Sequence, residues 1–256
     1  MDVFTLKLIA VLTMFIDHAG AALTQTSPYA PVLGFSALWL RVIGRVAFPI
    51  YAFLISEGCR HTGNMKKYLL RLGLFALISE IPYDIFFGGV RQFPDLTPVI
   101  WDFTEQNVFF TLFLGALAIF WHETDKRRLS ESGDKFGWVS HAALLAVIFA
   151  LAEALKTDYG ARGAMLIFAF YISRNKAAKI ITGLAGLYAL YIYPDIYEYP
   201  FNAQLFAGGT VALIFIALYN GKPGIKARWF FYAFYPAHLL ALTLVFALTF
   251  AQPLFH

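Results

Sequence analysis

Apolar residues fall into nine runs along the chain, separated by prolines, glycines and clusters of charge. The runs cover roughly residues 6–23, 38–58, 68–87, 107–121, 138–155, 163–173, 180–193, 205–219 and 229–250. The longer runs have the length that a helix needs to cross a hydrocarbon core of about 30 Å. The pattern predicts an all-α, polytopic transmembrane helical bundle of about nine spans, with residues 1–256 forming a single integral membrane domain. The runs at 163–173 and 180–193 are short, which is compatible with tilted or partly re-entrant helices.

Lysine and arginine are concentrated in every second loop between these runs. Segments 60–71 and 126–135 carry four each, and segments 174–179 and 222–228 carry three each. Segments 24–36 and 194–204 carry none, 88–106 carries one, and 156–162 carries two. Because basic loops stay on the cytosolic side, the alternation predicts a cytosolic N-terminus, an outside C-terminus and an odd number of spans. The expected location is the bacterial cytoplasmic (inner) membrane.

Composition supports a membrane protein. Hydrophobic residues make up 59% of the chain and charged residues 14%, whereas soluble domains average about 45–50% and about 25%. The lipid bilayer is therefore an expected partner, and no nucleic acid is expected. Cys59 is the one cysteine, which excludes an intrachain disulfide or a cysteine-cluster metal site, and the scattered histidines do not support a metal site. The chain lacks the nucleophile-elbow, P-loop, dinucleotide and zinc-protease motifs.

Several ionisable residues fall inside the predicted spans, where charge is costly and therefore usually functional or paired. They are Asp17, His18, Arg41, Arg45, Glu80, Asp84 and Glu153. Counting along each span places all of them in the outer half of the membrane. Helix-to-helix ion pairs that hold the bundle together are one interpretation of the arginines and acids. A reaction site or substrate path is the other.

His18 is the candidate general base, because an imidazole deep in a span beside acids suits proton transfer. Asp17 or Glu80 is the expected partner of its imidazolium form, although neighbouring helical residues point about 100° apart. His238 and Tyr235 lie near the middle of the last span, in FYAFYPAHL. His238 is expected either to line a tunnel or to hydrogen-bond a backbone carbonyl that Pro236 leaves without a donor.

A second polar set is predicted at the cytosolic surface: Arg60, Asn220, Lys222 and Lys226. Basic residues there commonly orient the protein or bind anionic lipid. The turn NGKPG also suits phosphate binding, because backbone amides and a lysine converge in such Gly-rich turns.

Four segments together resemble the TraX family in order and spacing. They are LKLIAVLTMFIDHAGA, the long stretch from LRVIGRVAFPIYAFLISEGCRH to LISEIPYD, TDYGARGAMLIFAFY, and LYNGKPGIKARWFFYAFYPAHL. The resemblance covers essentially the whole chain. It implies pilin-acetylase-like activity within the wider transmembrane acyltransferase superfamily, with acyl-CoA taken from the cytosol. It also implies that Asp17 and His18 occupy the functionally central position near the end of the first span, and that Arg41 and Arg45 belong to an R-x-x-x-R-x-x-F-P element.

The resulting hypothesis is an acyltransferase that uses acetyl-CoA as the acyl donor and no metal. The phosphates of the donor would bind at Arg60, Lys222 and Lys226, and its pantetheine arm would pass His238 towards His18. The full predicted donor-binding set is Arg41, Arg60, Asn220, Lys222, Lys226, Tyr235 and His238. His18 would then activate the acceptor, with Arg45 stabilising the oxyanion. The acceptor would be a protein N-terminus, a glycan or a lipid-linked sugar. A transporter or flippase with a proton relay and a structural subunit of a secretion apparatus are the alternatives.

Overall fold

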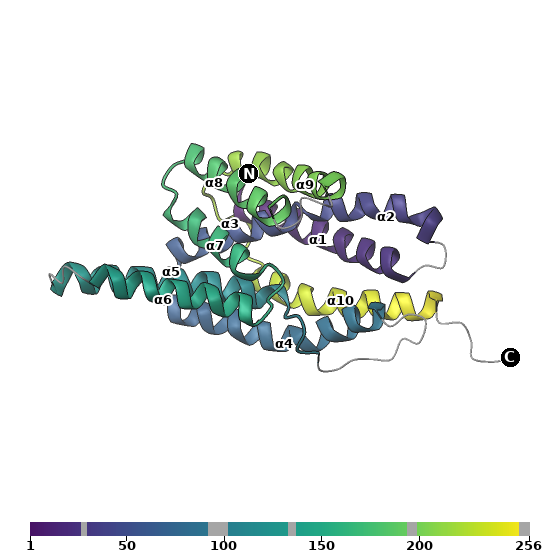
Figure 1. The fold of residues 1–256 in the computed structure, drawn as a ribbon, viewed down its shortest axis with the longest axis horizontal. Coiled ribbons are helices and arrows are strands. Elements are labelled where there is room, and N and C mark those ends of the chain that lie inside the picture. Colours follow the sequence, from purple (N-terminus) through teal and green to yellow (C-terminus); the bar gives the residue numbers. More distant parts are fainter. Residues whose placement is uncertain (27–29, 92–101, 133–136, 194–198, 251–256) are drawn as a thin grey trace. The chain divides into compact units, whose positions relative to one another are not determined.

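The structure is a computed structural model that describes residues 1–26, 30–91, 102–132, 137–193 and 199–250, with side chains at fewer positions near the gaps. These residues form ten α-helices (Figure 1). The helices are α1 (Val3–Thr26), α2 (Ala30–Gly44), α3 (Ala47–His61), α4 (Met65–Arg91), α5 (Val108–Ser132), α6 (Gly137–Ala154), α7 (Gly160–Ile172), α8 (Lys176–Tyr191), α9 (Tyr199–Ala217) and α10 (Arg228–Phe250). The all-α prediction is confirmed for the described part of the chain.

Five helical stretches have the length and apolar composition needed to cross a membrane. They are Val3–Thr24, Ala37–His61, Val108–Glu131, Gly137–Ala154 and Arg228–Thr249. Two shorter apolar helices, Gly160–Ile172 and Phe201–Ala217, accompany them. Large apolar side chains such as Leu70 and Leu248 point outward and are more than two thirds exposed, as a lipid-facing surface requires. The protein is a helical membrane protein, while the count of nine spans and their orientation remain predictions.

The predicted span 38–58 is not one uninterrupted helix. Helix α2 begins earlier, at Ala30, and ends at Gly44, and α3 begins at Ala47. Between them the amide of Val46 donates to the carbonyl of Ile43, a tighter turn than the α-helical pattern. Pro49 then falls in the first turn of α3, where its missing N–H costs nothing because first-turn amides have no intrahelical acceptor.

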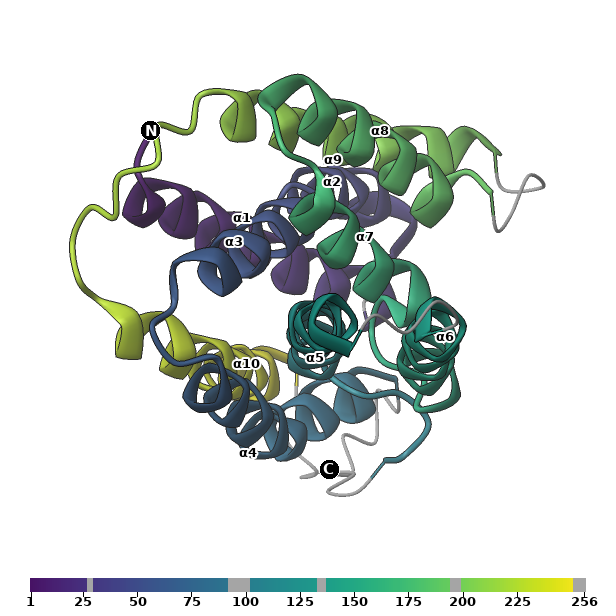
Figure 2. The same cartoon turned by 90° about the vertical axis from the view of Figure 1, so that its left-hand side faces the viewer.

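Contacts group the chain into two compact units. Unit 1 comprises Met1–Ile50, Leu77–Phe103 and Tyr197–His256, and unit 2 comprises Tyr51–Ala76 and Thr104–Ile196. In unit 1, α1 packs against α2 and α10, and α2 packs against α9. In unit 2, α5, α6 and α7 pack on one another and α8 packs on α7; Figure 2 shows α5 and α6 side by side, nearly end-on.

Glycines allow close approach of the helices within unit 1. A Cβ atom added to Gly20 of α1 would lie 2.8 Å from the Cβ of Leu40. A Cβ on Gly44 of α2 would overlap the side chain of Asp17, and one on Gly208 of α9 would overlap the carbonyl oxygen of Val42. Small residues at helix contacts are the usual way for membrane helices to gain van der Waals packing. The close contact of α1 with α2 determines where Asp17 points.

In unit 2, Asn107 fixes the start of α5. Its Oδ1 accepts from the amide of Phe109 at 3.0 Å, as an N-cap does, and its Nδ2 donates to the carbonyl of Ala76 at 2.8 Å. The residue is fully buried. One side chain therefore both caps α5 and satisfies a carbonyl of α4.

Candidate functional site

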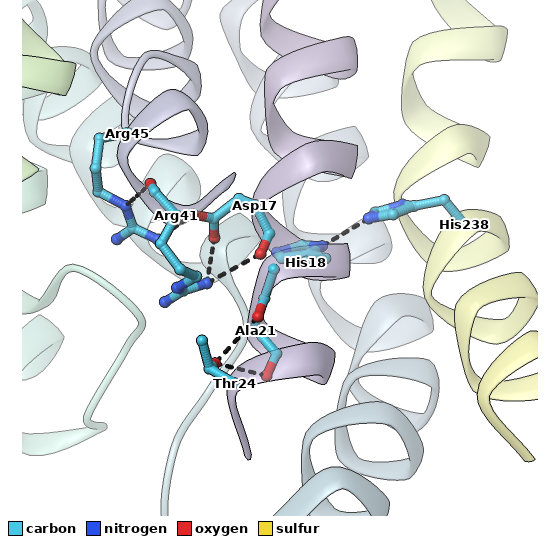
Figure 3. A network of polar contacts seen from close by, with 8 residues as sticks. Asp17, His18, Ala21, Thr24, Arg41, Arg45 and His238 are labelled. Atoms are coloured by element: carbon cyan, nitrogen blue, oxygen red, sulfur yellow. Dashed lines mark hydrogen bonds and ion pairs between the residues drawn. The ribbon is translucent and has the colours of Figure 1, made fainter. Parts of the chain in front are cut away.

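Asp17 and His18 are adjacent on α1 and point to different neighbours (Figure 3). The rotation of about 100° per helical residue separates their side chains. The carboxylate of Asp17 meets the arginines of α2, and the imidazole of His18 meets α10. Both residues are 8% exposed, so neither is set in open solvent.

Asp17 binds two arginines at once. Its Oδ2 lies 2.6 Å from Nη1 of Arg41, and its Oδ1 contacts Nη2 of Arg45. Arg41 also donates to the backbone carbonyl of Asp17 at 3.3 Å, and Nε of Arg45 donates to the carbonyl of Arg41 at 3.3 Å. The side chains are 27% exposed for Arg41 and 11% for Arg45 and Asp17. The three groups carry one net positive charge in a desolvated position.

This arrangement differs in one respect from the sequence-based expectation. Arg41 and Arg45 do share a face, as their spacing of four residues predicts. However, the carboxylate of Asp17 points to that face and not to His18. The described hydrogen-bond partner of the His18 ring is His238, and the expectation that Asp17 or Glu80 stabilises its imidazolium form stays a prediction. The role of Arg45 toward an oxyanion remains a prediction.

The partner of His18 is His238. Nδ1 of His18 and Nε2 of His238 are 2.7 Å apart, and the two rings are stacked with centroids 4.9 Å apart and an interplanar angle of 6°. His238 is 4% exposed. A pair of imidazoles separated by 220 positions in the sequence thus joins α1 to α10 in the interior of unit 1.

Hydrogen-bond chemistry fixes the tautomers of this pair when both rings are neutral. Nδ1 of His238 lies 2.9 Å from the carbonyl oxygen of Phe234, which can only accept, so Nδ1 carries the proton. Nε2 of His238 then holds a lone pair and accepts from the Nδ1–H of His18. The remaining lone pair is on Nε2 of His18, which has no hydrogen-bond partner among the described residues.

The carbonyl that His238 binds is not the one expected. Pro236 lacks an N–H, so it leaves the carbonyl four residues earlier, that of Tyr232, without its helical donor. The ring of His238 binds Phe234 instead. Of the two sequence-based alternatives for His238, the bond to the carbonyl freed by Pro236 is not the one formed, and the tunnel lining stays a prediction; the structure adds the contact with His18.

Aromatic rings surround the histidine pair. Phe86 and Phe87 of α4 lie 6.0 and 5.5 Å from the ring of His18, measured between centroids. Tyr235 of α10 lies 6.1 Å from His18 and 5.6 Å from His238, and it is buried. Tyr235, predicted as a binding residue, therefore belongs to the wall around the pair. Such a wall limits water near the imidazoles and strengthens electrostatic interactions there.

The two acids of α4 are buried as predicted, Glu80 at 7% and Asp84 at 2% exposure. Oδ2 of Asp84 accepts the backbone N–H of Asp102 at 3.0 Å. This bond ties α4 to the segment that precedes α5. The described contact of Asp84 is therefore a structural one, a side chain holding the backbone at Asp102.

The predicted phosphate-binding loop is exposed and belongs to unit 1. Asn220 accepts from the amide of Lys222 at 3.0 Å through its Oδ1, and the carbonyl of Lys222 accepts from the amide of Val3 at 2.9 Å. Gly221 and Gly224 have φ angles of 77° and 65°, which favour glycine. The loop therefore has a defined turn geometry, and Lys222 and Lys226 project from it into solvent.

Arg60 lies in unit 2 and is engaged by its own unit. Its guanidinium donates to the carbonyls of Tyr171 and Ser173, the latter at 3.2 Å, at the C-terminal end of α7. It also pairs with Glu57 at 3.4 Å. An arginine at this position satisfies carbonyls that a helix end leaves without donors. The described contacts of Arg60 are thus those of a helix cap.

A second histidine pair was missed by the sequence analysis. Nδ1 of His122 lies 3.1 Å from Nε2 of His141, and Nδ1 of His141 lies 2.9 Å from Oδ2 of Asp125. Arg128 pairs with the other oxygen of Asp125 at 2.7 Å. The spacing of three residues between His122 and Asp125 puts them on one helix face, which is the signal that was available. Within the described residues no three such side chains are arranged to hold a metal ion.

Comparison with known proteins identifies the family. A protein-family model described as "TraX protein" matches residues 3–246. The chain belongs to the TraX family. This TraX-family protein is 30% identical over 251 residues to the probable fimbrial assembly protein FimC, serogroup H1, of Dichelobacter nodosus, with 93% of each chain covered. It is 25% identical over 246 residues to the protein TraX of Escherichia coli (strain K12), with 93% of this chain and 84% of the relative covered. No solved structure matches at a significant level.

Proposed function

We propose that this TraX-family protein is a membrane-bound acyltransferase of the bacterial cytoplasmic membrane. It transfers an acetyl group from cytosolic acetyl-CoA to an amine or hydroxyl of a membrane-associated or extracytoplasmic acceptor. The observation that carries the proposal is the chain from the Phe234 carbonyl through His238 to His18. It leaves one lone pair, on Nε2 of His18, in a buried aromatic setting suited to a general base.

In the proposed reaction His18 removes a proton from the acceptor as the acceptor attacks the thioester carbon. The new bond to the acyl carbon forms, the C–S bond breaks, and the proton returns from His18 to the departing thiolate. The imidazolium of His18 keeps its Nδ1–H bond to His238, whose Nε2 lone pair stabilises the positive charge. The adjacent Arg41–Asp17–Arg45 cluster, with its net positive charge, supplies favourable electrostatics for the oxyanion.

The donor is proposed to bind through its phosphates at the exposed loop of unit 1. Lys222 and Lys226 project from a turn whose shape Gly221 and Gly224 permit, and such turns suit phosphate groups. Arg60 does not enter this proposal, because α7 carbonyls and Glu57 already occupy its guanidinium.

The acceptor is proposed to be the N-terminal amine of a fimbrial or pilin-type subunit. The supporting observation is that a relative matching over nearly its full length is named a probable fimbrial assembly protein. A hydroxyl of a glycan or lipid-linked sugar is the alternative outcome of an acceptor assay. The amine attacks in its uncharged form, and His18 takes the proton that the attack releases.

The test separates donor binding from chemistry in the detergent-purified full chain. His18→Ala is expected to bind acetyl-CoA like the parent but to lose transfer by about 10²–10⁴-fold. Lys222→Ala is expected to weaken acetyl-CoA binding several-fold. His61→Ala, at an exposed histidine outside both pairs, is the matched control and is expected to behave like the parent. Absence of acyl-CoA binding by the folded parent protein would refute the acyltransferase proposal and favour transport.

His238 is tested by two substitutions that differ in whether the new side chain can accept a hydrogen bond. His238→Gln can place an amide oxygen where Nε2 accepts the bond from His18, whereas His238→Leu cannot. Transfer is expected to persist in part in the first variant and to fall towards the level of His18→Ala in the second. The pH dependence of transfer is expected to shift in both, which loss of packing alone would not produce. Equal activity of the two variants would contradict the role of His238.

A further inference from the structure

In the pair His122–His141 of unit 2, Nδ1 of one ring faces Nε2 of the next, as in His18–His238. This second chain ends on a carboxylate, whereas the first ends on a backbone carbonyl. Asp125 is 1% exposed, and Arg128 contacts its Oδ1 at 2.7 Å, so a cation lies beside the buried carboxyl group. Helix α5 supplies His122, Asp125 and Arg128, and α6 supplies His141. The two helices lie side by side (Figures 1 and 2).

The protons of this chain can be assigned from its terminal acceptor. Asp125 as a carboxylate only accepts, so Nδ1 of His141 carries a proton and donates to it. Nε2 of His141 then accepts from Nδ1–H of His122. Nε2 of His122 is left with the lone pair, and it has no hydrogen-bond partner among the described residues. A carboxylate that orients one imidazole, which in turn orients a reactive group, is the logic of a catalytic triad.

The ring of His122 is accessible from outside and lies among charges of both signs. It packs edge-to-face on Phe168, with centroids 5.3 Å apart, and the residue is only partly buried. Glu123, Lys126 and Arg127 are exposed beside it, while Arg128 is paired with Asp125. By the positive-inside rule this basic end of α5 is predicted to face the cytosol, the compartment in which anionic acyl thioesters occur.

We propose that His122 is a nucleophilic imidazole that accepts an acyl group from an acyl thioester. Its Nε2 attacks the carbonyl carbon, an N–C bond forms and the C–S bond breaks. The Nδ1 proton of His122 passes to Nε2 of His141, whose imidazolium is stabilised by Asp125. That proton then neutralises the departing thiolate, which leaves an N-acyl imidazole and a free thiol. The site lies in unit 2 and does not depend on the function proposed for His18.

A purely structural role for the chain, as a clasp between α5 and α6, makes a different prediction. A clasp needs the two hydrogen bonds and the Arg128–Asp125 ion pair but gives Nε2 of His122 no exceptional reactivity. His61 provides the internal reference, since its side chain is 70% exposed and it faces only Glu57 at 3.8 Å. A relay is expected to make the less exposed His122 the faster of the two.

The experiment measures acylation of each histidine in the detergent-purified full chain by mass spectrometry, with diethyl pyrocarbonate and then acetyl-CoA as probes. With diethyl pyrocarbonate, His122 is expected to react at least several-fold faster than His61. His141→Gln and Asp125→Asn are expected to reduce the rate at His122 by about tenfold or more and to leave His61 unchanged. With acetyl-CoA, a hydroxylamine-sensitive acetyl adduct is expected on His122 and is expected to form equally in the His18→Ala variant.

Four results would overturn the inference. The relay is wrong if His122 reacts no faster than His61. It is also wrong if His141→Gln leaves the reaction rate of His122 unchanged while an unchanged rate at His61 shows that the variant remains folded. The thioester class is wrong if diethyl pyrocarbonate labels His122 but acetyl-CoA gives no adduct. An adduct that disappears in His18→Ala would mean that the label arises from the His18 site, not from an independent one.

Discussion

Neutralising Asp17 is expected to destabilise the protein strongly, because its carboxylate is the counter-charge of two guanidinium groups that are largely withdrawn from solvent. The change Asp17→Asn keeps the shape of the side chain and removes one negative charge. Arg45 is 11% exposed and Arg41 27%, so water screens little of the charge that remains. Removing one partner of a buried ion pair costs about 3–5 kcal/mol. For a chain of this size that corresponds to a fall in Tm of about 6–20 °C.

A double variant sharpens the argument. Asp17→Asn together with Arg45→Gln removes one of the two stranded positive charges and is expected to be more stable than Asp17→Asn alone. The double variant Asp17→Asn/Arg41→Gln is expected to recover less of the lost stability, because the more exposed Arg41 is better solvated. Thermal unfolding of the detergent-purified protein, followed by tryptophan fluorescence, measures all of these variants against the parent and each arginine single variant.

The decisive comparison is whether the double variant Asp17→Asn/Arg45→Gln is more or less stable than Asp17→Asn alone. If the effects of Asp17→Asn and Arg45→Gln simply add, so that the double variant is the least stable, the charges do not interact as the distances indicate. If Asp17→Asn is as stable as the parent, the carboxylate is not the counter-charge of the arginines. Either result would refute the reasoning from buried charge.

Three further substitutions test the packing and the caps. Gly44→Ala is expected to cost about 1–3 kcal/mol, because the new Cβ overlaps Asp17, whereas Gly63→Ala, with nothing within 4 Å, should change unfolding free energy by only a few tenths. Asn107→Leu is expected to cost about 1–3 kcal/mol by removing the cap of α5 and the side-chain bond to the carbonyl of Ala76; Asn107→Ser, an uncharged residue that keeps only the cap, should lose less. Arg60→Lys is expected to speed amide hydrogen exchange in the last turn of α7 by about tenfold, while exchange in α10 stays unchanged.

Some features of the site follow from the helical period alone. The spacing of Arg41 and Arg45 predicts a shared face, and both do meet Asp17. The adjacency of Asp17 and His18 predicts that they point apart, and they do. Composition and apolar run lengths predict an all-α membrane protein, which the helices confirm. These inferences are local, so they need no knowledge of how distant segments pack.

Only the tertiary structure decided which side chains meet. Periodicity places His18 on a face of α1 but cannot tell whether an acid of α4 or an imidazole of α10 lies opposite. That choice depends on how distant helices pack, just as the pairing of Asp17 with the arginines of α2 depends on the close α1–α2 approach that Gly20 and Gly44 allow. The same holds for His122 and His141, and for Arg60, whose charge suggested a phosphate but whose neighbour is the end of α7. The sequence thus determined the faces of the helices, and long-range packing determined their partners, because polar groups away from water must pair with whatever group the fold brings within reach.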